Sequence, residues 1–348
     1  MEFPDAQHGF FIGFRMLFSS LSRASLVAIL ASLMAGCSDL VLLNPAGDVA
    51  AQKGQLIIIA TVLMLLIVVP VIFFIFLFAW RYRQGAKHAQ TEYSPDWDHS
   101  TRLELLIWAA PLVIIIALGA LTWISTHKLD PYRPLDRISA SMSLPENVKP
   151  LEVEVVSLDW KWLFFLPEQG IAMVNELAAP VNRPIRFKLT SSSTMNAFYV
   201  PDLAGMIYTM PGMQTELNAV INKPGVYRGM SSHYSGEGFS GMTFKFHGLS
   251  DGDFEQWVAQ AKAEGSALTR DTYLALSKPS SRDPVQRFAS VEDGLYRRIM
   301  NLCVQEGQMC MDEMMARDAV RNRAHRLNRA QDKLAQQEIC TTNTPLFE

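Results

Sequence analysis

Two long apolar runs without any charged residue lie in the first third of the chain, at residues 56–80 and 105–126, and contain 25 and 22 residues. A helix rises about 1.5 Å per residue, so roughly 20 apolar residues cross the hydrocarbon core of a bilayer. Pro70 and Pro111 interrupt the runs, but neighbouring helices can satisfy the backbone groups that proline frees in a membrane. The pattern predicts a hairpin of two transmembrane helices within residues 37–130, and it excludes a wholly soluble protein.

Basic residues between the two runs predict the orientation of this hairpin. Arg81, Arg83, Lys87 and Arg102 lie close to the membrane ends of the intervening loop. Positive residues near membrane helices stay on the cytoplasmic side. The chain before the first run and everything after about residue 127 should therefore face the periplasm.

A shorter apolar stretch at residues 26–36 follows Arg15 and Arg23 and ends in L-M-A-G-C at Cys37. A basic start, a short apolar stretch and small residues before a cut describe an export signal. The ending resembles the bacterial lipoprotein signal, which implies removal of residues 1–36 and a diacylglycerol on Cys37. The alternative is a buried cysteine in a third membrane helix. A start at Met16 would give the signal a typical length.

Beyond Pro150 the period of the pattern changes. The runs L-E-V-E-V, R-P-I-R-F-K-L and T-F-K-F-H alternate apolar and polar residues, as half-buried strands do. Proline and glycine clusters separate them as turns. We expect a β-sandwich or barrel over residues 150–250. A helical extension over residues 251–348 should begin with an amphipathic helix at 253–263.

Composition adds one exclusion to this picture. The chain has 348 residues, with 31 Lys and Arg against 34 Asp and Glu and a net charge of −3. A nucleic-acid surface normally shows a strong basic excess. We therefore expect no nucleic-acid partner.

Several linked motifs carry a family resemblance. They are D-W-K-W-L-F at 159–164, P-E-Q-G-I-A at 167–172, P-G-M-Q-T at 211–215 and Y-S-G-E-G-F-S-G-M at 234–242. In this order, after two membrane helices, they resemble subunit II of the haem–copper oxidases, most closely the cytochrome bo-type ubiquinol oxidases. The resemblance implies a cupredoxin-like domain and membership of a quinol oxidase that reduces O₂ to water and pumps protons in the bacterial inner membrane. Haem, copper and quinol would then belong to the partner subunit I.

The cytochrome c oxidase branch of that family holds a dinuclear copper centre through one isolated histidine and a C-x-E-x-C-x3-H-x2-M run. Aligned on this chain, the bridging cysteines fall on Ser231 and Ser235 and the isolated histidine on Asn196. The glutamate falls on His233, the second histidine on Phe239 and the methionine on Met242.

Only Met242 keeps its ligand type. Paired copper ions need soft thiolate bridges, and serine hydroxyls or a phenyl ring cannot replace them. We therefore expect no metal and no redox centre in this chain, which would be a non-catalytic subunit. The resemblance then implies that quinol delivers electrons directly to subunit I. His233 in place of the carboxylate also puts a magnesium contact at the subunit interface in doubt. A new ligand role for His233 is an alternative to a solvated side chain.

Glu104 opens the second apolar run on the cytoplasmic side. The resemblance places a glutamate of this position at the mouth of a proton-uptake path in subunit I, and ionisable residues at membrane edges often serve function. The alternative is a solvated charge or a partner of Arg102.

Other sulfur and aromatic residues leave alternatives open. Trp160 and Trp162 should pack against the partner subunit. If Cys303 and Cys310 share one helix, they lie about 10 Å apart and cannot pair, so a bridge from Cys340 to one of them is favoured. Methionines around Cys310 form either an apolar helix face or a Cu(I) site; the residues are Met309, Met311, Met314 and Met315.

A second function from a different class is a membrane-anchored periplasmic copper-binding or copper-delivery module. It would use scattered methionines that lack histidine neighbours: Met195, Met206, Met210, Met213 and Met242.

Overall fold

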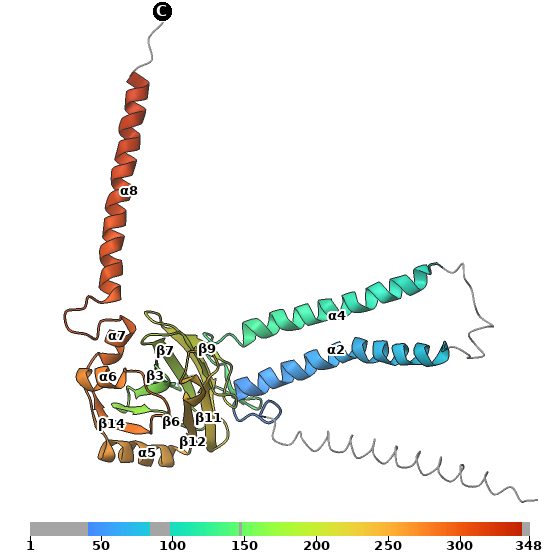
Figure 1. Cartoon of the computed structure of the whole chain (residues 1–348), viewed down its shortest axis with the longest axis horizontal. Coiled ribbons are helices and arrows are strands. Elements are labelled where there is room, and N and C mark those ends of the chain that lie inside the picture. The colour runs from blue at the N-terminus through green and yellow to red at the C-terminus, as the bar shows by residue number, and fades with distance from the viewer. Residues whose placement is uncertain (1–40, 84–97, 146–147, 343–348) are drawn as a thin grey trace, which may run out of the picture. The chain divides into compact units, whose positions relative to one another are not determined.

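The computed structural model describes residues 41–83, 98–145 and 148–342, with side chains described as far as residue 334. Figure 1 labels its helices and several of its strands. Cys37, the export signal at 1–36 and Lys87 lie outside the described residues.

The two predicted N-terminal helices are confirmed. Helix α2 spans Asp48–Arg81 and α4 spans Thr101–Lys128, and each includes one apolar run with its proline. Both are long and apolar enough to cross a membrane. Their large apolar side chains, among them Phe76, Leu105 and Trp108, are exposed on the isolated chain. Such surface is stable only against lipid or other membrane helices.

Two sheets form the predicted sandwich. The seven-stranded sheet has the order β10-β7-β3-β4-β5-β14-β13, and the five-stranded sheet has the order β6-β12-β11-β8-β9. A two-stranded ribbon, β1 (Arg137–Ser139) and β2 (Met142–Ser143), precedes them. The strands of the first sheet are β3 (Leu151–Leu158), β4 (Lys161–Leu166), β5 (Ile171–Val174), β7 (Pro184–Ser191), β10 (Thr215–Val220), β13 (Ser266–Leu268) and β14 (Gln286–Val291). Those of the second are β6 (Glu176–Pro180), β8 (Asn196–Tyr199), β9 (Ile207–Thr209), β11 (Gly225–Ser231) and β12 (Thr243–Leu249).

Aromatic side chains fill the space between the sheets. Trp162 and Phe164 of β4 meet Phe198 of β8 and Phe244 of β12. The rings of Phe198 and Phe244 are stacked with centroids 5.3 Å apart. Aromatic pairs of this kind add specific geometry to the area that they bury.

A second apolar cluster lies on the other face of the seven-stranded sheet. Leu163 and Phe165 of β4 pack there with Tyr273, Tyr296 and Ile299 from the C-terminal extension. The extension contains α5 (Asp251–Glu264), α6 (Arg270–Leu276), α7 (Leu295–Met300) and α8 (Met311–Thr342). Because β4 is buried on both faces, its sequence K-W-L-F-F-L does not alternate.

The C-terminal helices are confirmed, and the extension also contributes two strands that the sequence analysis did not predict. Strand β14 pairs antiparallel with β5, and β13 pairs parallel with β14. The short run Q-R-F-A-S-V has too few alternations to signal a strand alone. It forms one because β5 offers a free edge beside an apolar face that needs cover.

Candidate functional site

The two loops that should carry the copper ligands meet at the end of the five-stranded sheet. Asn196 begins β8 and Ser231 ends β11, and these strands pair with Ser231 opposite Phe198. Met242 directly follows the 3-10 helix η1 (Phe239–Gly241), and its carbonyl accepts a hydrogen bond from the Ser231 amide at 3.1 Å. The structure therefore brings together Asn196, Ser231 and Met242.

Hydrogen bonds within the chain satisfy the side chains of Asn196 and Ser231. The Ser231 hydroxyl lies 3.3 Å from Asn196 Oδ1 and 3.2 Å from the His233 carbonyl, either of which it can donate to. Asn196 Nδ2 donates to the Thr194 carbonyl at 3.1 Å. Asn196 is 2% and Ser231 5% exposed. Buried polar groups are stable when paired in this way. The Ser235 hydroxyl differs, because its oxygen is buried without a hydrogen-bond partner among the described residues.

The loop after Ser231 rests on an indole ring. Trp160 Nε1 donates to the Ser235 carbonyl at 3.0 Å, and a Cβ at Gly238 would overlap the ring. Trp160 itself has a φ of 66°, a left-handed conformation that bulky residues adopt only when the surroundings fix them. Phe239 faces Tyr234 edge-on with centroids 5.6 Å apart. The phenyl ring of Phe239 thus stands at the position where the alignment places the second histidine ligand.

The remaining donors are one thioether and one imidazole. Met242 is 1% exposed. His233 is partly buried and lies edge-on to Tyr208 with ring centroids 5.7 Å apart. Among the residues that the structure describes, no group of three or more His, Cys, Asp or Glu could hold a metal ion. A thioether without thiolate or imidazole neighbours binds copper weakly, so this donor set does not fit a dinuclear copper centre.

Trp162 corrects one prediction. We expected it to pack against the partner subunit, but it is fully buried in the core of its own domain. Its ring lies edge-on to Phe198 and Phe244. Strand alternation points it inward from β4, whereas Trp160 lies in the preceding turn and stays partly exposed.

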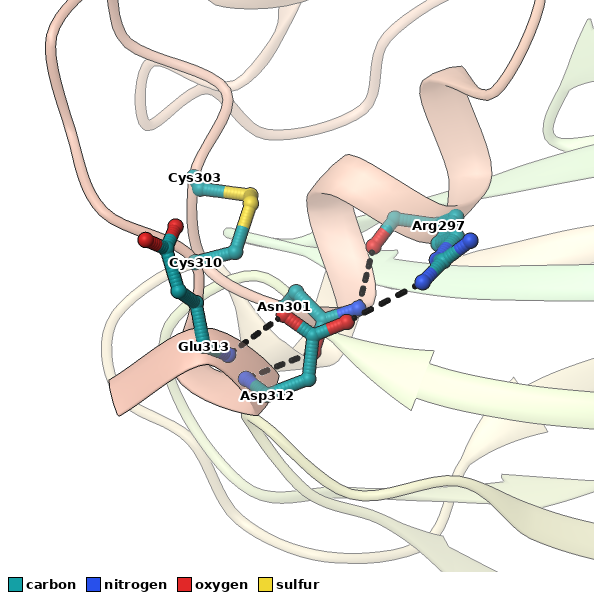
Figure 2. The surroundings of a disulfide bond; sticks show 6 residues. All are labelled: Arg297, Asn301, Cys303, Cys310, Asp312 and Glu313. Carbon is teal, nitrogen blue, oxygen red and sulfur yellow. Dashed lines mark hydrogen bonds and ion pairs between the residues drawn. A yellow bond between two sulfur atoms is a disulfide. The ribbon is translucent and has the colours of Figure 1, made fainter. Parts of the chain in front are cut away.

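The cysteine prediction is wrong. Cys303 forms a disulfide with Cys310, with the Cα atoms 4.7 Å apart (Figure 2). The two residues do not share a helix, because α7 ends at Met300 and α8 begins at Met311. The intervening loop brings the sulfur atoms together, which spacing alone could not show. Cys310 therefore has no thiolate to add to a Cu(I) site with its neighbouring methionines.

Glu104 lies in the first turn of α4 and is exposed. Its amide donates to the Ser100 carbonyl at 2.9 Å. Within the described part of the chain, its carboxylate has no ion pair with Arg102 or any other residue. The structure leaves this side chain available to water or to a partner.

Sequence reasoning missed one buried ion pair beside the site. Lys161, 1% exposed, places Nζ 3.0 Å from Asp283 Oδ2 and 3.0 Å from the Lys278 carbonyl, and it also donates to Ser280. Asn175 joins the same segment to the core, donating to the Asp283 carbonyl at 2.9 Å and accepting from the Trp162 amide at 2.9 Å. A lysine inside an apolar strand was the available signal, because a buried ammonium must have partners.

Two family models match the chain. "Cytochrome C oxidase subunit II, periplasmic domain" matches residues 163–247, and "COX Aromatic Rich Motif" matches residues 262–307. The second match covers β13, α6, β14 and α7, the part of the extension that covers the seven-stranded sheet.

Similar proteins agree with these matches. Cytochrome bo(3) ubiquinol oxidase subunit 2 of Pseudomonas aeruginosa is 49% identical over 81% of this chain and 81% of its own length. Ubiquinol oxidase subunit 2 of Acetobacter aceti is 46% identical over 78% of this chain and 84% of its own. Among solved structures, the periplasmic domain of subunit II of cytochrome oxidase (CoxB) of Bradyrhizobium japonicum matches at 25% identity and a TM-score of 0.32, over 33% of this chain and 94% of that domain.

The fold and the relatives together define the class as subunit II of the haem–copper oxidases, and the chain belongs to its ubiquinol oxidase family. It is a subunit of an oxidoreductase complex rather than a complete enzyme.

Proposed function

We propose that this chain is a non-catalytic, copper-free subunit II of a proton-pumping terminal oxidase, and that quinol delivers electrons directly to the haem- and copper-bearing subunit I. The donor set at the two loops supports this most strongly. Hydroxyl, amide and phenyl groups stand where thiolates and imidazoles would hold copper. Of these, Ser231 bonds to Asn196 within the chain and Phe239 packs on Tyr234. Reduced cytochrome c would have no acceptor here.

The choice of electron donor tests this proposal. The purified complex should consume O₂ with ubiquinol and show no consumption above background with reduced cytochrome c. A complex that oxidises cytochrome c through this subunit would contradict the proposal. Absence of a haem-bearing subunit from the purified material would contradict it as well.

The chain's remaining role would be to scaffold subunit I, cap its periplasmic side and anchor the domain to lipid. The exposed apolar surfaces of α2 and α4 support this role, because they need membrane partners. Removal of residues 1–36 and acylation of Cys37 complete the proposal. The intact mass of the mature subunit tests this step: a mass matching the uncleaved, unmodified chain would contradict it.

We further propose that Glu104 passes protons from the cytoplasm into subunit I. Its exposed carboxylate at the start of α4, without a partner in the described residues, supports this role. Glu104→Gln keeps the shape but cannot carry a proton. We expect it to slow quinol oxidation and proton uptake by about two- to tenfold, less than the loss of a direct proton donor, because water can partly bypass an entrance residue.

The matched control is Glu255→Gln, which removes an exposed carboxylate from α5 in the periplasmic domain. It should leave both rates unchanged. Equal rates for Glu104→Gln and the parent complex would contradict a role of Glu104 in proton uptake.

The copper-delivery alternative receives less support. Of its methionines, Met242 is buried, whereas Met206 and Met213 are exposed on separate segments. They do not form one site.

A further inference from the structure

A cavity of about 150 Å³ lies where the start of α2 and the end of α4 approach the segment 129–137 and strand β10. This volume exceeds the roughly 10–15 Å³ that one water needs, so it has room for a larger polar group. Its wall has one more cationic side chain than carboxylates; the charged lining residues are Asp48, Lys53, Lys128, Asp130, Arg133, Asp136 and Arg137.

Two of these cations are neutralised within the chain. Asp48, 5% exposed, accepts from Arg137 Nε at 2.9 Å and from Gln52 Nε2 at 2.7 Å. Arg133 pairs with Asp136 at 3.2 Å. These pairs leave two lysines and Asp130, an exposed carboxylate that accepts a hydrogen bond from the Tyr132 amide at 2.9 Å.

Lys53 is the unusual group. It is partly buried, and its ammonium lies over the backbone of Gly205, where a Cβ would overlap Nζ. Within the described residues, neither Lys53 nor the exposed Lys128 has a carboxylate or another hydrogen-bond acceptor. A partly buried ammonium without an acceptor is costly. An anion from outside the chain would remove this cost.

The position along the helices indicates the source of that anion. Lys53 directly precedes the uncharged part of α2, and Lys128 ends α4. Both therefore lie at the boundary of the apolar segments on the predicted periplasmic side. Lipid phosphates occupy this level of a bilayer, and basic pockets between membrane helices bind lipid head groups.

We propose that this cavity binds the phosphate group of an outer-leaflet phospholipid between Lys53 and Lys128. The inference rests on the membrane topology included in the proposed function. Arg137 and Asp48 hold the wall in shape, and Gly205 leaves space for the Lys53 ammonium.

Acetylation of Lys53 tests the proposal. The full-length chain, in its complex or alone in detergent, is stripped of lipid and treated with acetic anhydride, and peptide mass spectrometry gives the labelling rates. Lys262, exposed on α5, serves as the control within the same molecule. Adding phosphatidylglycerol vesicles should slow labelling of Lys53 by about tenfold, because a bound phosphate covers the amine and holds its proton, and should leave Lys262 unchanged.

Gly205→Ala provides the matched variant. The added methyl group would displace only the flexible end of Lys53, so folding should persist while lipid protection is lost. Lysine labelling can be measured on the chain without subunit I, so it tests lipid binding alone. Co-purification with subunit I tests the proposed function separately.

Three outcomes would overturn the proposal. Equal protection by inorganic phosphate would identify a free anion as the ligand. Protection of Lys53 in the stripped complex, but not in the chain alone, would identify a group of subunit I. Labelling of Lys53 at the same rate with and without vesicles would show that no phospholipid binds.

Discussion

At the scale of single residues, the side chains at the positions aligned with the copper ligands contact groups of their own domain. Ser231 and Asn196 contact each other and the backbone of their own loops. Phe239 packs on Tyr234, and the loop between them rests on Trp160. Alignment of the motif predicted which residues meet here. It could not predict that these groups satisfy one another, because hydrogen-bond partners depend on loop conformation.

Glu154, also considered at the residue scale, is a partly buried carboxyl group with a raised pKa. It lies on β3 between Phe165 of β4 and Lys188 of β7. Burial raises its pKa to about 7, partly opposed by the charge of Lys188. In the unfolded chain the ordinary value of 4.5 applies. The folded domain therefore loses stability as the pH rises from about 4.5 to 7, because the folded state holds the proton more tightly over that range.

We predict that Glu154→Gln stabilises the domain at pH 8 and has little effect at pH 4.5. The gain should be on the order of 1–2 kcal/mol after allowance for partial exposure and for Lys188. Thermal melting of the purified complex at the two pH values measures it, with Glu255→Gln as the exposed control. A lower melting temperature for Glu154→Gln at pH 8 would contradict the assigned burial.

At the scale of elements, local contacts join α7 to the start of α8 (Figure 2). The Met311 amide donates to the Asn301 carbonyl at 2.9 Å, and Arg297 pairs with Asp312 at 3.2 Å. The Cys303–Cys310 disulfide closes the loop between the two helices. These contacts fix the first turn of α8, whose later turns are exposed as far as the side chains are described.

We predict that Cys303→Ser loosens this junction without unfolding the sandwich. Opening so short a loop should weaken the local structure by on the order of 2 kcal/mol. Hydrogen exchange should become faster at residues 301–314 and stay unchanged in β3 and β4. Cys340→Ser is the matched control and should behave like the parent chain. Faster exchange in Cys340→Ser, with unchanged exchange in Cys303→Ser, would contradict the Cys303–Cys310 disulfide and favour a bridge to Cys340.

The extension also shows how far patterns predict elements. Uncharged runs predicted α2 and α4 because length and polarity alone decide a membrane helix. The sequence analysis did not predict β13 and β14, because tertiary pairing determines them rather than local periodicity: β14 pairs with β5, and β13 pairs with β14. Lys161 escaped prediction as well, because its partners Lys278 and Asp283 lie more than 100 residues away.

At the scale of the whole molecule, one cupredoxin-like domain follows two membrane-capable helices. Side chains of the C-terminal extension pack on the outer face of the seven-stranded sheet. The fold is that of the subunit II family, and the side chains at its two loops lack the thiolate and imidazole donors that a dinuclear copper centre needs. The central proposal is therefore a chemical one, namely that this subunit contains no copper.

The copper-to-haem ratio of the purified oxidase complex tests this claim most directly. A variant with the donors restored, Asn196→His, Ser231→Cys, Ser235→Cys and Phe239→His, serves as the positive control, since Met242 is already present. We predict that all copper of the parent complex belongs to subunit I and that the restored variant gains about two further ions per complex through thiolate bridges. Copper that remains with the parent subunit II after its separation from subunit I would contradict the claim.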